Sequence, residues 1–175
     1  MTTDSAPDAV IAAVSSPPGR GARGLVRATG AGLDALLPAI LGGGEELPPR
    51  TIRRAVFTLD GSALPTLATR IPGPRSATGE DMLELLMPGH PDLLERVVDA
   101  IVTVVRAHGR SARRAGPGEF TARAFMNGRI DLCAAEGVAT TIAARTDAEL
   151  DAGRLLMRGA LGAVAEGFVR ELTHA

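Results

Sequence analysis

The residues best suited to bind an anion are two arginines in the stretch 117–136, which also holds two of the four phenylalanines of the chain. A turn inside this stretch separates two helical patterns, so Arg123 and Arg129 are left facing a polar partner. A guanidinium donates several hydrogen bonds in a fixed planar geometry, which suits a carboxylate or a phosphate. The stretch is therefore either a helix–turn–helix joint between two packed layers or a binding corner for an anionic ligand.

A third candidate is Glu84, which lies within the apolar, strand-like run 82–87. A lone acid in such a strand is costly unless it has a partner. Glu84 either faces solvent on an edge strand or accepts hydrogen bonds from the N–H groups of a ligand. Glu80, Asp81 and Glu84 could supply a general acid–base pair, although Glu80 and Asp81 are equally suited to accept hydrogen bonds from turn amides.

No other pattern in the sequence indicates catalysis or metal binding. Cys133 lies in a helical pattern with no histidine nearby, so we predict a small buried side chain rather than a nucleophile. One cysteine and three scattered histidines make no metal-ligand spacing. A phosphate-binding P-loop needs a lysine, and every basic residue here is arginine. We therefore predict no catalytic residue, no metal site and no nucleotide hydrolysis by the usual mechanism in this polypeptide.

The composition is that of a globular protein with one domain and at most an appendage. The chain has 175 residues, 45% of them hydrophobic, with 19 basic and 20 acidic side chains. This charge balance does not indicate a nucleic-acid binder, and a single cysteine fits a reducing cytosol. Residues 1–8 lack the basic start and apolar run of a signal peptide, and no apolar run reaches the ~20 residues needed to span a bilayer. We expect a cytoplasmic protein that does not enter a membrane.

Periodicity and turn signals predict the elements that position these residues. The pair Asp60-Gly61 indicates a hairpin between two strands. Thr121 is expected to cap a short helix that ends at Gly128, and Asp131 to begin the next helix. The expected strands are 8–14, 24–28, 51–59, 64–71, 82–87 and 111–115, and the expected helices are 32–41, 91–108, 121–126, 131–142 and 147–172.

These elements predict an α+β architecture, in which a mixed or barrel-like sheet of short strands carries flanking helices and is followed by C-terminal helices. Residues 1–118 are expected to form the sheet domain and residues 119–175 to begin a helical domain. The last helix needs a surface for its apolar stripe, so it packs on the preceding helix, on a second copy of the chain, or on nothing. The stripe consists of Met157, Leu161, Val164, Phe168 and Leu172.

Four sequence blocks resemble the MnmE/TrmE family of tRNA-modification GTPases. The block at 117–132 reads Pro-Gly-Glu-Phe-Thr-Ala-Arg-Ala-Phe-Met-Asn-Gly-Arg-Ile-Asp-Leu. The others are Ser-Pro-Pro-Gly-Arg-Gly at 16–21, Gly-Leu-Val-Arg-Ala-Thr-Gly at 24–30 and Pro-Gly-Pro-Arg-Ser-Ala-Thr-Gly-Glu-Asp-Met-Leu-Glu-Leu at 72–85. They follow one another in the order of the family. The resemblance covers residues 8–175 and corresponds to the N-terminal domain and the first part of the helical domain of that family.

The resemblance implies a folate-binding fold similar to that of the glycine-cleavage T-proteins, which dimerises and binds 5-formyl-tetrahydrofolate near the dimer contact. Matched residue by residue, the folate-binding arginine of the family falls on Arg27, its glutamate on Glu84, and its basic residue, usually lysine, on Arg129. A carboxylate can accept hydrogen bonds from the ring N–H groups of a reduced pterin, and arginine can hold the carboxylates of the folate tail. The three residues are expected to converge on one hollow.

The resemblance further implies action on the wobble uridine of tRNA together with a partner flavoprotein. This chain lacks the GTPase domain and the C-terminal cysteine motif of the family, so GTP, Mg²⁺ and K⁺ are expected only if a GTPase domain exists elsewhere. It also departs from the family at 86–90, where Gln-Gly-His-Gly-Gly is usual, and at Ala77, where an aromatic residue is expected. Three functions stay open: the folate-binding, dimer-forming domain of a tRNA-modification GTPase, a degenerate dimerisation module without folate, and a stand-alone one-carbon enzyme.

Overall fold

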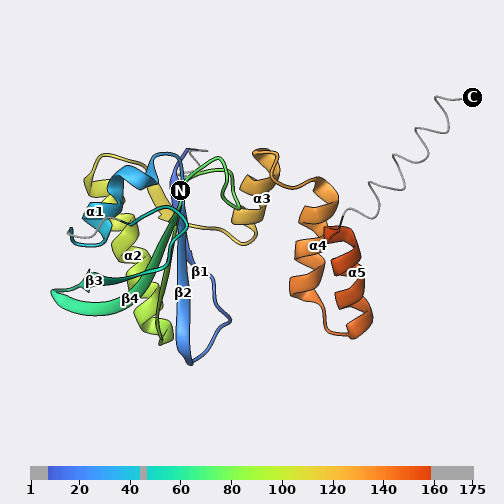
Figure 1. Ribbon diagram of the computed structural model, residues 1–175. Helices are drawn as coiled ribbons and strands as arrows, with labels where there is room; N and C mark the ends of the chain where they lie inside the picture. Colours follow the sequence, from blue (N-terminus) through green and yellow to red (C-terminus); the bar gives the residue numbers. More distant parts are fainter. Residues whose placement is uncertain (1–7, 44–46, 159–175) are drawn as a thin grey trace, which may run out of the picture. The chain divides into compact units, whose positions relative to one another are not determined.

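The computed structural model describes residues 8–43 and 47–158, and the chain divides into two compact units, 1–117 and 118–175 (Figure 1). The first unit is built on a β-sheet and the second is helical, which confirms the predicted α+β class. The elements of the first unit are β1 (Val10–Val14), β2 (Gly21–Thr29), the 3₁₀ helix η1 (Leu33–Leu36), α1 (Leu37–Ile40), β3 (Arg53–Leu59), β4 (Ser62–Ile71), β5 (Met82–Gly89), α2 (Pro91–Ala107) and β6 (Ala112–Arg114). Those of the second unit are α3 (Glu119–Met126), α4 (Leu132–Ala143) and α5 (Asp147–Met157).

The strands that the structure describes form one sheet of six, in the order β3-β4-β5-β2-β1-β6. Only the β1–β6 pair is parallel, so the sheet is mixed, as predicted. The two outermost strands, β3 and β6, lie at opposite edges, and the sheet is therefore open. This corrects the barrel-like alternative, because a barrel would require these two edges to pair with each other.

The β3–β4 hairpin turns at the predicted Asp60-Gly61 pair. Both residues have positive φ, 49° and 76°. This is the requirement of a type I′ turn, whose backbone twist matches that of the flanking strands. The two-residue loop fixes the register, so Leu59 pairs with Ser62 and, further along, Arg54 pairs with Leu67.

Helix α2 covers one face of the sheet (Figure 1) and forms the core with it. Its apolar residues recur at intervals of three and four, which places them on one side of the helix, and they pack against alternate residues of the strands. Arg114 of β6 is bonded to Glu95 and Asp99 of α2, and this guanidinium lowers the pKa of the Asp99 carboxyl. The buried core includes Leu94, Val97, Val98, Ile101 and Val105 of α2, with Val10, Val26, Phe57, Leu83, Leu85 and Met87 of the sheet.

Two local predictions are wrong and one is confirmed. The expected helix 32–41 is split into η1 and α1, because Pro38 has no N–H to continue the helical ladder. Thr121 does not cap α3; the N-cap is Gly118, and Thr121 lies inside the helix. Asp131 does cap α4, where its carboxylate accepts a 2.7 Å hydrogen bond from the backbone N–H of Ala134.

Helix α5 begins with a capping box, in which two side chains satisfy backbone amides of the first turn. The hydroxyl of Thr146 accepts from the N–H of Glu149, and the Glu149 carboxylate accepts from the N–H groups of Arg145 and Thr146. These bonds, chiefly the one from Arg145, lower the pKa of Glu149. The described part of this helix ends at Met157, so the predicted stripe beyond residue 158 lies outside the described residues.

We expect Thr146→Ala to destabilise α5 by about 1 kcal/mol, because the amide of Glu149 loses its acceptor. Amide hydrogen exchange in α5, compared with exchange in α2, measures this effect locally. Thr146→Ser is the control, since it keeps the hydroxyl and should leave exchange close to that of the parent chain. If the amides of α5 are as protected in Thr146→Ala as in the parent chain, the cap contributes nothing to the stability of the helix.

Candidate functional site

Arg27 and Glu84 form an ion pair at the middle of the sheet. They lie directly opposite each other on β2 and β5, and both strands are interior strands. The Nε and Nη2 atoms of Arg27 donate to Oε1 of Glu84 at 2.8 and 2.6 Å. The two side chains are 30% and 23% exposed, so the pair is half-buried. The interpretation of Glu84 as a solvent-facing acid on an edge strand is therefore wrong.

The second carboxylate oxygen of Glu84 remains able to accept hydrogen bonds. Both bonds from Arg27 end on Oε1, and within the described part of the chain no bond to Oε2 is found. This oxygen is not buried, because every buried side-chain oxygen or nitrogen described here has a partner. Thr69 lies beside Glu84 on β4 and is half-buried. A carboxylate oxygen flanked by a guanidinium and a hydroxyl suits a ligand that presents N–H groups.

Met87 does not block this acceptor. It lies three residues after Glu84 on the same strand, and successive strand residues point to opposite faces. Its side chain is fully buried in the core beneath α2. The Arg27–Glu84 pair is thus on the sheet face opposite that core.

The neighbouring acids have structural roles. One oxygen of Asp81 accepts from the N–H of Gly73 at 3.0 Å and the other from the N–H of Asp34 at 3.5 Å. The carboxylate of Glu80 accepts from the hydroxyl of Thr29 at 3.3 Å, and this hydroxyl also lies 2.7 Å from that of Thr78. These bonds tie the 72–81 loop to the end of β2. Asp81 therefore satisfies turn amides, which was one of its two predicted roles.

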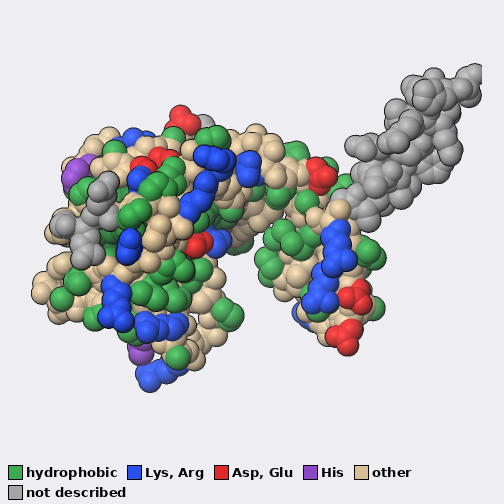
Figure 2. Space-filling view, viewed as in Figure 1, with side chains coloured by type: hydrophobic (Ala, Val, Ile, Leu, Met, Phe, Trp, Pro, Cys, Tyr) green, Lys and Arg blue, Asp and Glu red, His purple; other side chains and the backbone are tan. Residues whose placement is uncertain are grey.

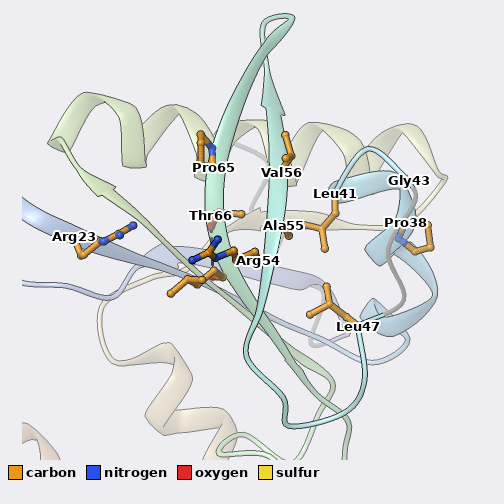
Figure 3. A pocket seen from close by; sticks show the side chains of 11 residues that line it. Arg23, Pro38, Leu41, Gly43, Leu47, Arg54, Ala55, Val56, Pro65 and Thr66 are labelled. Atoms are coloured by element: carbon orange, nitrogen blue, oxygen red, sulfur yellow. Dashed lines mark hydrogen bonds between the residues drawn. The ribbon is translucent and has the colours of Figure 1, made fainter.

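A cavity of about 690 Å³ lies in the first unit, beside the hairpin of β3 and β4. Its volume is in the range of small-molecule sites. Figure 3 shows Arg23 and Arg54 toward one side of it and Leu41 and Leu47 toward the other. Figure 2 shows basic and apolar side chains next to each other on the visible surface of this unit. The lining residues are Arg23, Pro38, Leu41, Gly43, Leu47, Arg54, Ala55, Val56, Pro65, Thr66 and Leu67, a set that does not include Arg27 or Glu84.

The arginines of the second unit differ in burial. Arg123 is buried and ion-paired with Glu119 one turn earlier on α3. Arg129 is exposed, and its backbone N–H closes the turn after α3 by donating to Ala124 at 2.8 Å. An apolar cavity of about 390 Å³ lies between α3 and α4, and Arg129 is not among its lining residues. The structure brings Arg27 and Glu84 together, and the convergence of Arg129 with them stays a prediction.

The remaining chemistry of the described residues is limited. Cys133 is half-buried in α4. Within 8–43 and 47–158, no three histidine, cysteine, aspartate or glutamate side chains are grouped to hold a metal ion. No helix in these ranges has the length and hydropathy needed to cross a bilayer.

Sequence reasoning missed Thr69, Arg23 and Arg54. Arg23 precedes Arg27 by four residues, and a strand period of two was a signal that could have grouped them. Arg54 could have been identified from the hairpin register, because the Asp60-Gly61 loop places it opposite Leu67. The position of Thr69 depends on the pairing of β4 with β5, which are joined by the 72–81 loop and not by a short turn.

Comparison with known proteins gives consistent matches. The family described as "GTP-binding protein TrmE N-terminus" matches residues 10–129. The "tRNA modification GTPase MnmE" of Ralstonia nicotianae is 37% identical over 166 residues, which cover 94% of this chain and 34% of that relative. The protein of the same name from Gluconacetobacter diazotrophicus is 37% identical over 179 residues, 98% of this chain and 38% of the relative. That of Methylibium petroleiphilum is 43% identical over 157 residues, 83% and 33% respectively. The chain spans about a third of the length of these relatives.

Proposed function

Because the chain belongs to the TrmE family, over the part described as the TrmE N-terminus, we propose that it binds a reduced folate, 5-formyl-tetrahydrofolate, as a one-carbon donor. Glu84 accepts from the ring N–H groups of the pterin, and Arg27 orients this carboxylate. Arg129 contributes a positive charge to the same ligand. The observation that carries the proposal is the accessible second oxygen of Glu84 at the centre of the sheet.

The residues around the pair fit this ligand chemically. The carboxylate is an acceptor only, and the ring N–H groups of a reduced pterin are donors, so their bonds are charge-assisted. The row next to the pair is apolar: Leu25, Leu86 and Leu67 lie side by side across three strands, and all are half-buried. An aromatic ring attached to the pterin can lie on such a surface. Folate supplies the one-carbon unit, and the residues of this chain bind and orient it.

In its biological setting we propose that this cytoplasmic chain forms a homodimer and serves wobble-uridine modification of tRNA together with a flavoprotein partner. A chain without lysine carries no P-loop, so GTP, Mg²⁺ and K⁺ take part only if a GTPase domain exists elsewhere. The relatives are named tRNA modification GTPases and are about three times as long as this chain. This supports a role for the chain as one part of such a tRNA modification GTPase.

A second candidate is a module that dimerises without binding folate. The exposed Ala77 favours it, because an aromatic residue at that position would offer a flat stacking surface. The buried position of Met87 favours the first candidate, since that side chain leaves the face that bears Glu84 open.

Equilibrium dialysis against 5-formyl-tetrahydrofolate distinguishes the two candidates. The chain has no tryptophan or tyrosine, so the ultraviolet absorbance of the ligand reports binding directly. We expect saturable binding of one folate per chain, and a dimer by sedimentation equilibrium at the same protein concentration. A dimer that binds no folate would support the second candidate, and a monomer that binds none would contradict both.

A further inference from the structure

Two arginines line the cavity of the first unit, and within the described part of the chain their side chains have no partner. Arg23 on β2 and Arg54 on β3 are exposed, and among the described residues neither makes a hydrogen bond or an ion pair. Some exposed arginines of this unit are paired, such as Arg96 with Asp60 and Arg114 with Asp99. Of the described arginines, Arg23 and Arg54 are the two that line the cavity. Two unpaired guanidinium groups on one cavity form a site for an anion with two acidic groups.

A continuous row of residues connects this cavity to the Arg27–Glu84 pair. Arg54 pairs with Leu67, Leu67 with Leu86, and Leu86 with Leu25, so these four residues lie side by side on one sheet face. Arg27, Glu84 and Thr69 form the next row, two residues further along each strand. With strands ~4.8 Å apart and a rise of ~3.3 Å per residue, Arg54 lies about 12 Å from Glu84, measured along the sheet.

We propose that Arg23 and Arg54 bind the carboxylates of the folate tail, an inference that rests on the proposed function. The pterin lies at Glu84, the aminobenzoyl ring lies on the leucine row, and the two carboxylates of the glutamate reach the two guanidinium groups. Arg23 lies at most about 13 Å along β2 from Arg27, given four residues at ~3.3 Å each and the shift in register between Gly21 and Gly24. The tail subsite therefore begins where the row of half-buried leucines ends.

The subsite also favours folates with several glutamates. Each added glutamate brings another carboxylate within reach of the two guanidinium groups, which are the charged groups that line the cavity; Leu41 and Leu47 on its other side are apolar (Figure 3). Attraction between exposed charges is screened by salt. The gain from additional glutamates should therefore shrink as the ionic strength rises.

The test uses the intact chain, with Arg23→Gln, Arg54→Gln and the double variant, and three probes: 5-formyl-tetrahydrofolate, its triglutamate form and a tail-less tetrahydropterin. Arg53→Gln is the matched control, because it removes the same charge from the neighbouring exposed position, which does not line the cavity. We expect each single variant to lower the affinity for folate about tenfold, and more for the triglutamate. Affinity for the tail-less pterin should not change.

The outcomes distinguish a failure of the proposed folate binding from a failure of the proposed tail subsite. If the parent chain binds neither folate nor the tail-less pterin, the proposed function is wrong and the subsite with it. If folate binds but the double variant and Arg53→Gln bind it as tightly as the parent chain, the pterin site stands and the tail subsite is overturned. An equal loss in the double variant and in Arg53→Gln would also overturn it, because that result indicates a general charge effect.

Discussion

Replacing Glu84 with glutamine is expected to lower the affinity for 5-formyl-tetrahydrofolate by about 100-fold. The substitution removes the negative charge and places an amide that donates where the ligand also donates. Hydrogen bonds to charged groups contribute about 1.5–3 kcal/mol each, and two bonds from the pterin would be weakened. Equilibrium dialysis of the variant and the parent chain, with a tail-less tetrahydropterin as a second ligand, measures the loss.

The same substitution removes the ion pair between Arg27 and Glu84, so folding must be measured separately from binding. Glu95→Gln is the matched control, because it removes one carboxylate from the exposed surface of α2, where Arg114 keeps Asp99 as a partner. The double variant Arg27→Gln/Glu84→Gln removes both charges of this ion pair, and its stability shows how much of any loss in Glu84→Gln comes from breaking the pair. If Glu84→Gln has the same melting temperature as the parent chain and binds folate equally well, the proposed role of this carboxylate is contradicted.

The sequence predicted the strands of the first unit well, because each strand has its own local signal. The Asp60-Gly61 turn determines the β3–β4 register through backbone geometry alone. Apolar residues at three- and four-residue intervals predicted α2 within about one turn of its observed ends. The predicted helix 32–41 is broken just before Pro38, where α1 begins. The missing N–H of a proline can be recognised in the sequence, so this break was predictable.

The candidate site was only partly predictable. The Arg27–Glu84 contact joins residues 57 positions apart, and no local pattern on β2 or β5 shows that these strands are neighbours. Resemblance to the family supplied both residues, but it could not show that they form an ion pair with each other. The unpaired state of Arg23 and Arg54 is likewise a property of the assembled sheet, because their distance from every acid depends on strand order.

Glycines determine how closely the helices of the second unit approach each other. A Cβ atom added to Gly137 of α4 would lie 2.6 Å from the backbone nitrogen of Met157 and 2.8 Å from the backbone oxygen of Gly153, both in α5. Both glycines are buried, each inside its helix. Because the opposing atoms belong to the backbone, no change of side-chain rotamer relieves these contacts. The two helices can pack in this way only while this position has no side chain.

Gly137→Leu is therefore expected to destabilise the α4–α5 pair by about 3 kcal/mol, the upper end of the usual cost of overpacking. Helix propensity alone predicts the opposite sign, since replacing a mid-helix glycine with a better helix former stabilises a helix by about 0.5–1 kcal/mol. Hydrogen exchange decides between them: the amides of α5 should lose protection in the variant, while those of β2 and β5 keep theirs. Glu136→Ala, at the exposed neighbouring position, is the control and should stay within about 0.5 kcal/mol. Increased protection of α5 in Gly137→Leu would mean that the helices do not approach closely at this glycine.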